Sequence, residues 1–207
     1  MSAELRGSDH MPPNVPFGDV AGVILAGGKS SRYGKNKALV EIEGISLIER
    51  VTAVMQSLFQ HLIIITNTPD EYAHLKLPMQ EDLIKGLGPL GGIFTALMSI
   101  TDVAGFFVAC DMPFLNPGLI RYMVDVKENF DAVVPRIHGN IEAIHALYSK
   151  RCLPNIRRLI DARQYQIFRF FPDISVRYVD ENEIRRFDPD LRSFFNINEP
   201  KALGTVT

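Results

Sequence analysis

VILAGGKSSRYGKNKAL, residues Val23–Leu39, carries the clearest structural signal in this chain of 207 residues. It begins with an apolar run typical of a buried strand and then turns on the glycine pair Gly27 and Gly28. A glycine turn exposes backbone N–H groups that attract phosphate, and it lets the phosphate come close. The stretch therefore predicts a strand followed by an anion-binding loop.

Four cations follow the glycine pair within nine residues, and they are Lys29, Arg32, Lys35 and Lys37. The glycines alone would also fit a tight turn before a solvated basic loop, but clustered cations favour a polyphosphate ligand. The loop is not a Walker A sequence, because Val23 stands where the first glycine is needed, and it is not a GxGxxG motif.

Further apolar runs alternate with helical patterns along the chain. The predicted strands are residues 20–26, 61–66, 105–110, 131–135 and 174–179. The first three are almost continuously hydrophobic, as in strands buried on both faces of a parallel sheet. Ser46 and Glu49 have the spacing of a helix capping box, and Asn116 with Pro117 predicts another helix start. The pattern indicates an α/β three-layer sandwich with a mostly parallel, Rossmann-like sheet.

Composition narrows the class of protein. The net charge of −2 argues against a nucleic-acid-coating protein, and no apolar run reaches the ~20 residues of a membrane span. Two distant cysteines without a CxxC pattern exclude a disulfide framework and indicate a reduced, cytoplasmic protein. We expect residues 1–19 to form a flexible tail and residues 20–207 to form a single domain.

Three polar segments follow predicted strands, where α/β folds bind their ligands. They are the glycine loop, Asn67 and Asp111. The carboxylate of Asp111 could hold Mg²⁺, which takes only one or two protein carboxylates, or it could cap the turn before Pro113. Two asparagines near the C-terminus, Asn196 and Asn198, could ligate a hard cation or cap a final helix.

A glycine-rich segment, EDLIKGLGPLGGI, begins at Glu81. Its small residues would let a flat nucleobase lie against the backbone, whose N–H and C=O groups could recognise the base edge. The pair Gly91 and Gly92 could equally serve close packing of a helix. Both interpretations fit the sequence of this segment.

Taken together, these motifs resemble those of nucleotidyltransferases that join an NTP to a phosphorylated acceptor. LAGGKSSRYGKNKAL is similar to the family loop LAGGxSxRMGxxK, CDMP to its metal-binding aspartate segment, and NINEP to its closing NxNTP segment. The glycine pair of LAGG and the GPLGG segment resemble one branch, the molybdenum cofactor guanylyltransferases. The resemblance implies the nucleotide-diphospho-sugar transferase type of fold.

The resemblance also implies roles for single residues. Arg32 and Lys37 would hold the triphosphate, and Asn67 and Asp82 would contact the nucleoside. Residues implied to line the phosphates and ribose are Leu25, Ala26, Gly27 and Gly28. Residues implied to recognise guanine are Pro89, Leu90, Gly91 and Gly92. Asp111 would bind Mg²⁺ with Asn198 as second ligand, so the implied catalytic residues are Arg32, Lys37 and Asp111.

The implied reaction transfers GMP from GTP to the terminal phosphate of Mo-molybdopterin and releases pyrophosphate. The segment NIEAIHALY, residues 140–148, resembles the family segment that faces the acceptor. Implied partners are GTP, molybdopterin and, transiently, proteins that deliver or accept molybdopterin. Sequence alone leaves open a cytidylyltransferase, a sugar-phosphate nucleotidyltransferase, a non-catalytic nucleotide-binding module and a flavodoxin-like protein.

Overall fold

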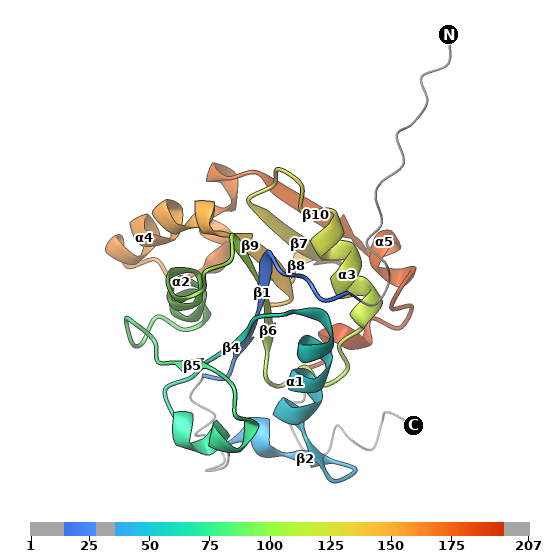
Figure 1. Cartoon of the computed structure of the whole chain (residues 1–207). Helices are drawn as coiled ribbons and strands as arrows, with labels where there is room; N and C mark the ends of the chain where they lie inside the picture. The colour runs from blue at the N-terminus through green and yellow to red at the C-terminus, as the bar shows by residue number, and fades with distance from the viewer. Residues whose placement is uncertain (1–14, 28–35, 197–207) are drawn as a thin grey trace.

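The computed structural model describes residues 15–27 and 36–196 of the chain. At its centre is a mixed, mostly parallel sheet with helices on both faces, as the sequence predicted (Figure 1). The strand order is β10-β7-β9-β6-β1-β4-β5, and β8 pairs with β7 outside this path. The strands of this sheet are β1 (Val20–Leu25), β4 (Leu62–Ile65), β5 (Met79–Gln80), β6 (Ala104–Ala109), β7 (Ala132–Ile137), β8 (Asn140–Ile141), β9 (Ala146–Ser149) and β10 (Val176–Asp180).

The helices cover the sheet in two layers. Figure 1 shows α2 and α4 on one face and α1, α3 and α5 on the other. The α-helices are α1 (Leu47–Leu58), α2 (Pro89–Ser99), α3 (Pro117–Asp125), α4 (Leu153–Asp161) and α5 (Glu181–Arg185). The 3₁₀ helices are η1 (Lys37–Leu39), η2 (Pro69–Leu75), η3 (Lys150–Cys152), η4 (Ile167–Asp173) and η5 (Arg192–Phe194). A small hairpin pairs β2 (Glu41–Ile42) with β3 (Ile45–Ser46).

Local sequence signals explain where two helices begin. The Ser46 hydroxyl accepts a hydrogen bond from the Glu49 N–H, and the Glu49 carboxylate accepts one from the Ser46 N–H, which completes the predicted capping box of α1. At α3 the Asn116 side chain accepts from the Leu119 N–H, and Pro117 occupies the first turn. A capping side chain is worth about 1 kcal/mol, so both starts are set locally.

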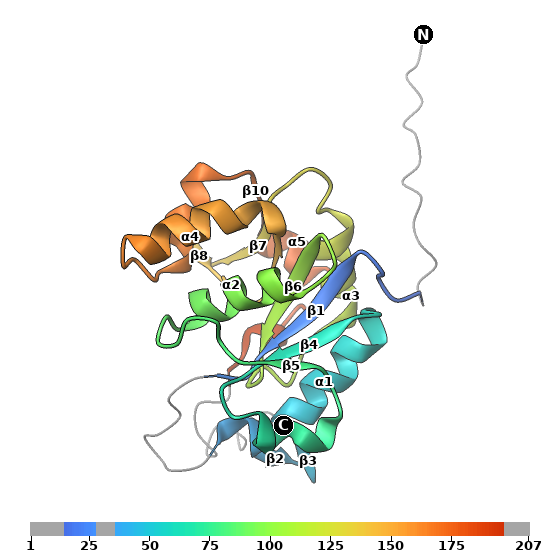
Figure 2. The ribbon, with the colours of Figure 1, turned by 60° about the vertical axis from the view of Figure 1, so that its left-hand side comes forward.

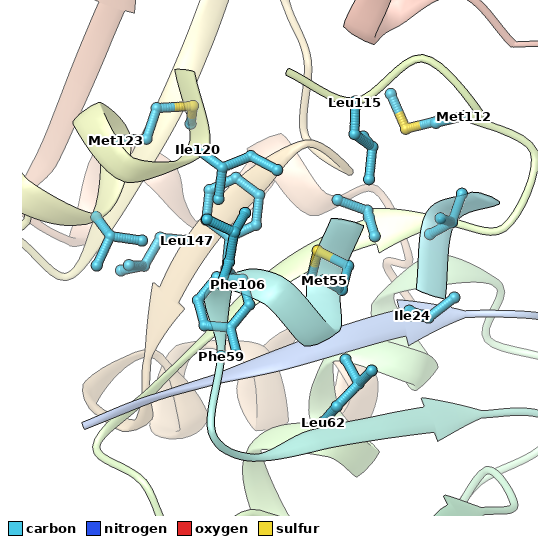
Figure 3. Close-up of a cluster of buried hydrophobic side chains, with 14 of the residues drawn as sticks. Ile24, Met55, Phe59, Leu62, Phe106, Met112, Leu115, Ile120, Met123 and Leu147 are labelled. Carbon is cyan, nitrogen blue, oxygen red and sulfur yellow. The ribbon is translucent and has the colours of Figure 1, made fainter. Parts of the chain in front are cut away.

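Two hydrophobic cores hold the layers together. Every residue of β1 is buried, because the strand contributes alternate side chains to both faces of the sheet. Between the sheet and helices α1 and α3, side chains such as Ile24, Met55 and Phe106 interdigitate (Figure 3). On the opposite face, Val23 and Phe107 belong to the core under α2 and α4. This burial fixes the position of the strand ends.

Two features differ from the sequence-based expectation. The predicted tail ended at residue 19, but Phe17 is already packed, with its ring centroid 5.7 Å from that of Phe59 and its N–H bonded to the Leu58 carbonyl. The sheet also contains β9, which runs antiparallel between β6 and β7. Its four residues carry no pattern that distinguishes strand direction.

The topology gathers several strand ends at one edge of the sheet. Strand β1 lies between β4 and β6 and runs parallel to both (Figure 2). Leu25, the last residue of β1, is level with Ile65 of β4 and Ala109 of β6. Strand β5 extends this row with Gln80, which is level with Ile65. In the described ranges, no helix has the length and apolar character needed to cross a bilayer.

Candidate functional site

The end of β1 forms the middle of the site. Leu25 and Ala26 are buried, and the Ala26 N–H donates to the Ile65 carbonyl at 2.9 Å. The Cys110 N–H donates to the Leu25 carbonyl at 3.1 Å, so the segment after β6 is fixed beside β1. Gly27 is exposed, and a Cβ built there would meet no atom of the described residues within 4 Å. Within residues 15–27 and 36–196, no side chain blocks the approach of a ligand to the Gly27 backbone.

The basic loop is described from Asn36 onward. Gly28 and Arg32, two predicted phosphate-binding residues, lie outside the described residues. Lys37 opens η1, and the Asn36 side chain caps this turn by accepting from the Ala38 N–H at 3.0 Å. The Asn36 amide also donates to the Tyr72 hydroxyl at 2.7 Å. These contacts attach the end of the basic loop to the body of the protein.

Tyr72 is an anchor that the sequence analysis missed. It is buried in the core beneath η1, and burial raises the pKa of its phenol to about 12. The hydroxyl therefore remains protonated at neutral pH and serves as a fixed hydrogen-bond partner for Asn36. A tyrosine in an otherwise polar stretch gives no sequence signal for this role.

The two predicted nucleoside-contacting residues are hydrogen-bonded to each other. The Asn67 amide donates to Asp82 Oδ2 at 2.7 Å, and the Asp82 N–H donates to Asn67 Oδ1 at 3.2 Å. They follow β4 and β5, which are neighbouring parallel strands. No hydrogen-bond partner for Asp82 Oδ1 occurs in the part of the chain that the structure describes. This oxygen is buried, so its hydrogen-bonding capacity is not used by the described residues and is not exposed to solvent.

A buried threonine holds the segment after Asp82 in place. The Leu83 N–H donates to Thr95 Oγ1 at 3.0 Å, and Thr95 is completely buried in α2. Sequence analysis missed this contact because Thr95 lies within an apolar helix and resembles a core residue. The bond connects the position of Asp82 to the packing of α2.

The glycine-rich segment divides into two parts with different roles. Gly86 and Gly88 have positive φ angles of 86° and 61°, which favour glycine. Gly91 and Gly92 are buried inside α2, and a Cβ on Gly92 would lie 2.9 Å from Leu25 Cδ2. The second pair therefore permits close packing of α2.

Helix α2 begins inside the segment that the sequence predicted to be a loop. Pro89–Gly92 forms its first turn rather than an extended base-binding loop. Leu90 is fully buried, so its side chain faces the core, whereas Pro89 and Gly88 are exposed. Contacts to a base at this place are limited to the exposed residues and the backbone at the helix start.

Asp111 follows β6 and lies within electrostatic range of Lys37. Burial raises the pKa of the Asp111 carboxyl, while a hydrogen bond from its own backbone and the charge of Lys37 lower it. Next to it, burial and the Asp111 charge raise the pKa of the Cys110 thiol to about 12, so this thiol is unreactive at neutral pH. The fold thus brings a cation and a carboxylate together beside β1.

The donor set at Asp111 fits a hard divalent cation. A cation beside this half-buried carboxylate would favour its charged form, which burial disfavours. Within residues 15–27 and 36–196 there is no cluster of three or more His, Cys, Asp or Glu residues. A site with one carboxylate suits Mg²⁺, which keeps several waters. The second predicted ligand, Asn198, lies outside the described residues.

Comparisons with known proteins show the family to which this chain is similar. The model of the MobA-like NTP transferase domain matches residues 22–176. A molybdenum cofactor guanylyltransferase from Desulfosudis oleivorans is 37% identical over 89% of this chain and 92% of its own length. The crystal structure of molybdopterin-guanine dinucleotide biosynthesis protein A from Archaeoglobus fulgidus is 28% identical, with a TM-score of 0.77 over 89% of this chain and 95% of that chain.

A more distant structure shares the fold alone. It is 4-diphosphocytidyl-2C-methyl-D-erythritol synthase from Anaerococcus prevotii, which is 13% identical, with a TM-score of 0.67 over 89% of this chain and 92% of that chain. This similarity shows that the two proteins share the three-layer α/β fold.

Proposed function

Because this chain belongs to the MobA-like NTP transferase family, we propose that it transfers GMP from GTP to the terminal phosphate of Mo-molybdopterin. Pyrophosphate leaves, and molybdopterin guanine dinucleotide forms. The observation that supports this reaction most strongly is the placement of Lys37 and Asp111 together at the end of β1. The names of the relatives support the choice of GTP and of molybdopterin.

The attacking group of this reaction requires no strong base. The nucleophile is an oxygen of a phosphate monoester, and such a group is largely ionised near neutrality because its second pKa is about 6. The catalytic problem is to bring two anions together, which requires charge neutralisation and positioning. Lys37 supplies positive charge, and the backbone at Gly27 leaves room for phosphate.

We propose that Arg32 and Lys37 hold the triphosphate and that Leu25, Ala26, Gly27 and Gly28 line the phosphates and ribose. Asp111 would hold Mg²⁺, with Asn198 as a further ligand. When bound, Mg²⁺ supplies positive charge next to the reacting phosphates. The Asp111 carboxylate fixes the place of that charge, because its backbone is bonded to the end of β1 through Cys110.

We propose that the base is recognised on the β4–β5 side of β1, opposite to Asp111. Asp82 Oδ1 is buried and has no partner among the described residues, so a small movement of the side chain would let it accept a hydrogen bond from guanine or from a ribose hydroxyl. Asn67 orients the Asp82 carboxylate through its own hydrogen bonds. The exposed start of α2 at Pro89 would contribute backbone contacts, with Leu90, Gly91 and Gly92 supporting it from the core.

We further propose that residues 20–207 act as one catalytic domain and that the reaction takes place in the cytoplasm, where GTP is available. Proteins that deliver molybdopterin or accept the product would bind transiently.

A comparison of nucleotides tests the proposed function. The purified protein is incubated with Mg²⁺, Mo-molybdopterin and either GTP or CTP, and pyrophosphate and acid-released nucleotide are measured. We expect GMP with little CMP. Release of CMP instead would keep the chemistry and overturn the base assignment. Tight GTP binding without any product would point to another acceptor or to a non-catalytic binding module.

A further inference from the structure

The position of the acceptor can be inferred from the row of residues at the carboxyl ends of the strands. The proposed nucleoside contacts, Asn67 and Asp82, follow β4 and β5, so the nucleoside would lie on the β4–β5 side of β1. The acceptor must then approach from the other side, across β6 and towards β7. This step rests on the function proposed above.

Strand register places an arginine on that acceptor side. Phe106 of β6, Leu147 of β9 and Val133 of β7 form one continuous row across the sheet. Three residues further along the two parallel strands, Ala109 is level with Arg136. Arg136 is thus in the same row as the end of β1, and the β7 backbone lies about 10 Å from that of β6, two strand spacings away.

The side chain of Arg136 is exposed but held in place. Its guanidinium carbon lies 4.0 Å from the centroid of the Tyr178 ring on β10. This cation–π contact leaves the N–H groups at the guanidinium edge available for a ligand. Strand β10 lies beyond β7 in the sheet, on the side away from β1. The contact with Tyr178 therefore holds the guanidinium charge of Arg136 on the part of the acceptor side that is farthest from GTP.

Two carboxylates at the end of β10, where Asp180 is level with Arg136, already have other partners. The Asp180 side chain accepts from the Glu183 N–H at 3.0 Å and caps α5. Glu181 pairs with His138, at 3.1 Å between Nδ1 and Oε2. No carboxylate of the described residues forms an ion pair with Arg136. Its positive charge is therefore not neutralised by the protein in this part of the chain.

We propose that Arg136, positioned by Tyr178, binds an oxyanion group of the acceptor and so contributes to acceptor specificity. Arginine is suited to this role because its planar fork donates two parallel hydrogen bonds to an oxyanion. Mo-molybdopterin offers two such groups, its phosphate and its oxomolybdenum centre. Arg136 is the binding residue, and Tyr178 is a positioning residue that acts through it.

The test measures the KM for the acceptor and the Kd for GTP in Arg136→Gln and Tyr178→Leu. We expect KM for Mo-molybdopterin to rise about 10-fold or more, as for loss of a charged hydrogen bond, while the GTP affinity and kcat change little. Tyr178→Phe keeps the ring face and should behave like the wild type. Arg157→Gln removes an exposed cation on α4 and serves as the matched control.

Equilibrium dialysis of the acceptor without nucleotide provides a readout that does not depend on turnover. A parallel comparison with metal-free molybdopterin identifies the oxyanion. Weaker binding of both forms assigns the phosphate, and weaker binding of the loaded form alone assigns the oxomolybdenum group. Unchanged acceptor affinity in Arg136→Gln would overturn the inference. Failure of the wild type to form the dinucleotide would instead overturn the proposed function.

Discussion

Among single residues, Asp111 combines a proposed role in metal binding with a cost in stability. Burial disfavours the charged carboxylate, as the raised pKa indicates, whereas the proposed metal site requires that charge. Asp111 therefore resembles functional groups that are retained although the fold alone would not select them.

The variant Asp111→Asn separates the cost of burying the carboxylate from its proposed role in metal binding. We expect the variant to unfold at an equal or higher urea concentration than the wild type, because a neutral amide avoids the desolvation of a carboxylate. Turnover should fall by about 10²-fold or more, as when an electrostatic stabiliser of the transition state is removed. Equilibrium unfolding and pyrophosphate release measure the two quantities. Undiminished turnover at ordinary Mg²⁺ concentration would remove Asp111 from the metal site.

Lys37→Ala tests the role of Lys37, the cation that lies within electrostatic range of Asp111. We expect a folded protein with reduced turnover and weaker GTP binding, because the triphosphate loses a neutralising charge. Arg157→Ala provides the control, since Arg157 is an exposed cation on α4 that pairs with Asp161 away from the row of strand ends. If both variants turned over GTP at the wild-type rate, Lys37 would have no role in the site.

Site residues were predictable from sequence to different degrees. Asp111 and Asn67 follow strongly apolar strands, so their place at the sheet edge could be predicted from periodicity. The hydrogen bonds between Asn67 and Asp82, and between Thr95 and Leu83, join residues 15 and 12 positions apart. Arg136 lies at the same edge, but its row is defined only once the register through β9 is known. Sequence patterns do not encode such register.

Among the secondary-structure elements, α2 was the hardest to predict. Glycine disfavours helix by about 1 kcal/mol relative to alanine, so a segment with four glycines was assigned to a loop. The helix forms because Gly91 and Gly92 allow it to lie close to Leu87 and Leu25. Packing thus outweighs intrinsic propensity here. By contrast, α1 and α3 carry local capping signals, and both starts were predicted correctly.

Alanine substitutions at the two buried glycines should differ in effect. A Cβ on Gly91 would lie 2.9 Å from Leu87 Cβ and 3.3 Å from the Ile84 carbonyl oxygen, atoms that move only with the backbone. We expect Gly91→Ala to lower the free energy of unfolding by about 1–3 kcal/mol, as for an overpacked core.

At Gly92 the contact is with the end of the Leu25 side chain, which can rotate away. Gly92→Ala should therefore change stability by less than about 1 kcal/mol, helped by the helix propensity of alanine. Urea unfolding of the two variants provides the comparison. Equal losses of stability would contradict the distinction between backbone and side-chain contacts.

For the whole molecule, a buried histidine couples stability to pH. His145 is fully buried between Phe106 and Phe194, with ring centroids 5.3 Å and 4.9 Å away. Burial lowers the pKa of His145 to about 4, and the Asp188 carboxylate only partly counteracts this. The folded protein therefore contains the neutral imidazole at physiological pH.

The sign of the pH effect follows from linkage. Below pH 6.5 the unfolded chain binds a proton at His145 that the folded protein excludes until about pH 4. The contribution of neutral His145 to the free energy of unfolding is fully present above pH 6.5. It decreases by up to about 3 kcal/mol as the pH falls towards 4. His145→Gln does not titrate, so its unfolding free energy should fall less over this range. Parallel pH profiles of the two proteins would contradict this assignment.

The architecture as a whole was predictable because alternating apolar strands and helices allow few arrangements. The antiparallel β9 was not predictable, since its direction follows from the connection between β7 and β9 through β8 rather than from a residue pattern. Strand β9 lies between β6 and β7 and so sets the distance between these two parallel strands.

The central claim, nucleotidyl transfer at the α-phosphate, is tested most directly with GTP labelled at either the α- or the γ-phosphorus. Each labelled GTP is incubated with the protein, Mg²⁺ and Mo-molybdopterin, and the products are separated. Label from the α-phosphorus should appear in the dinucleotide, and label from the γ-phosphorus should appear only in pyrophosphate. Recovery of the γ-label in the acceptor would indicate a kinase reaction and would contradict the account.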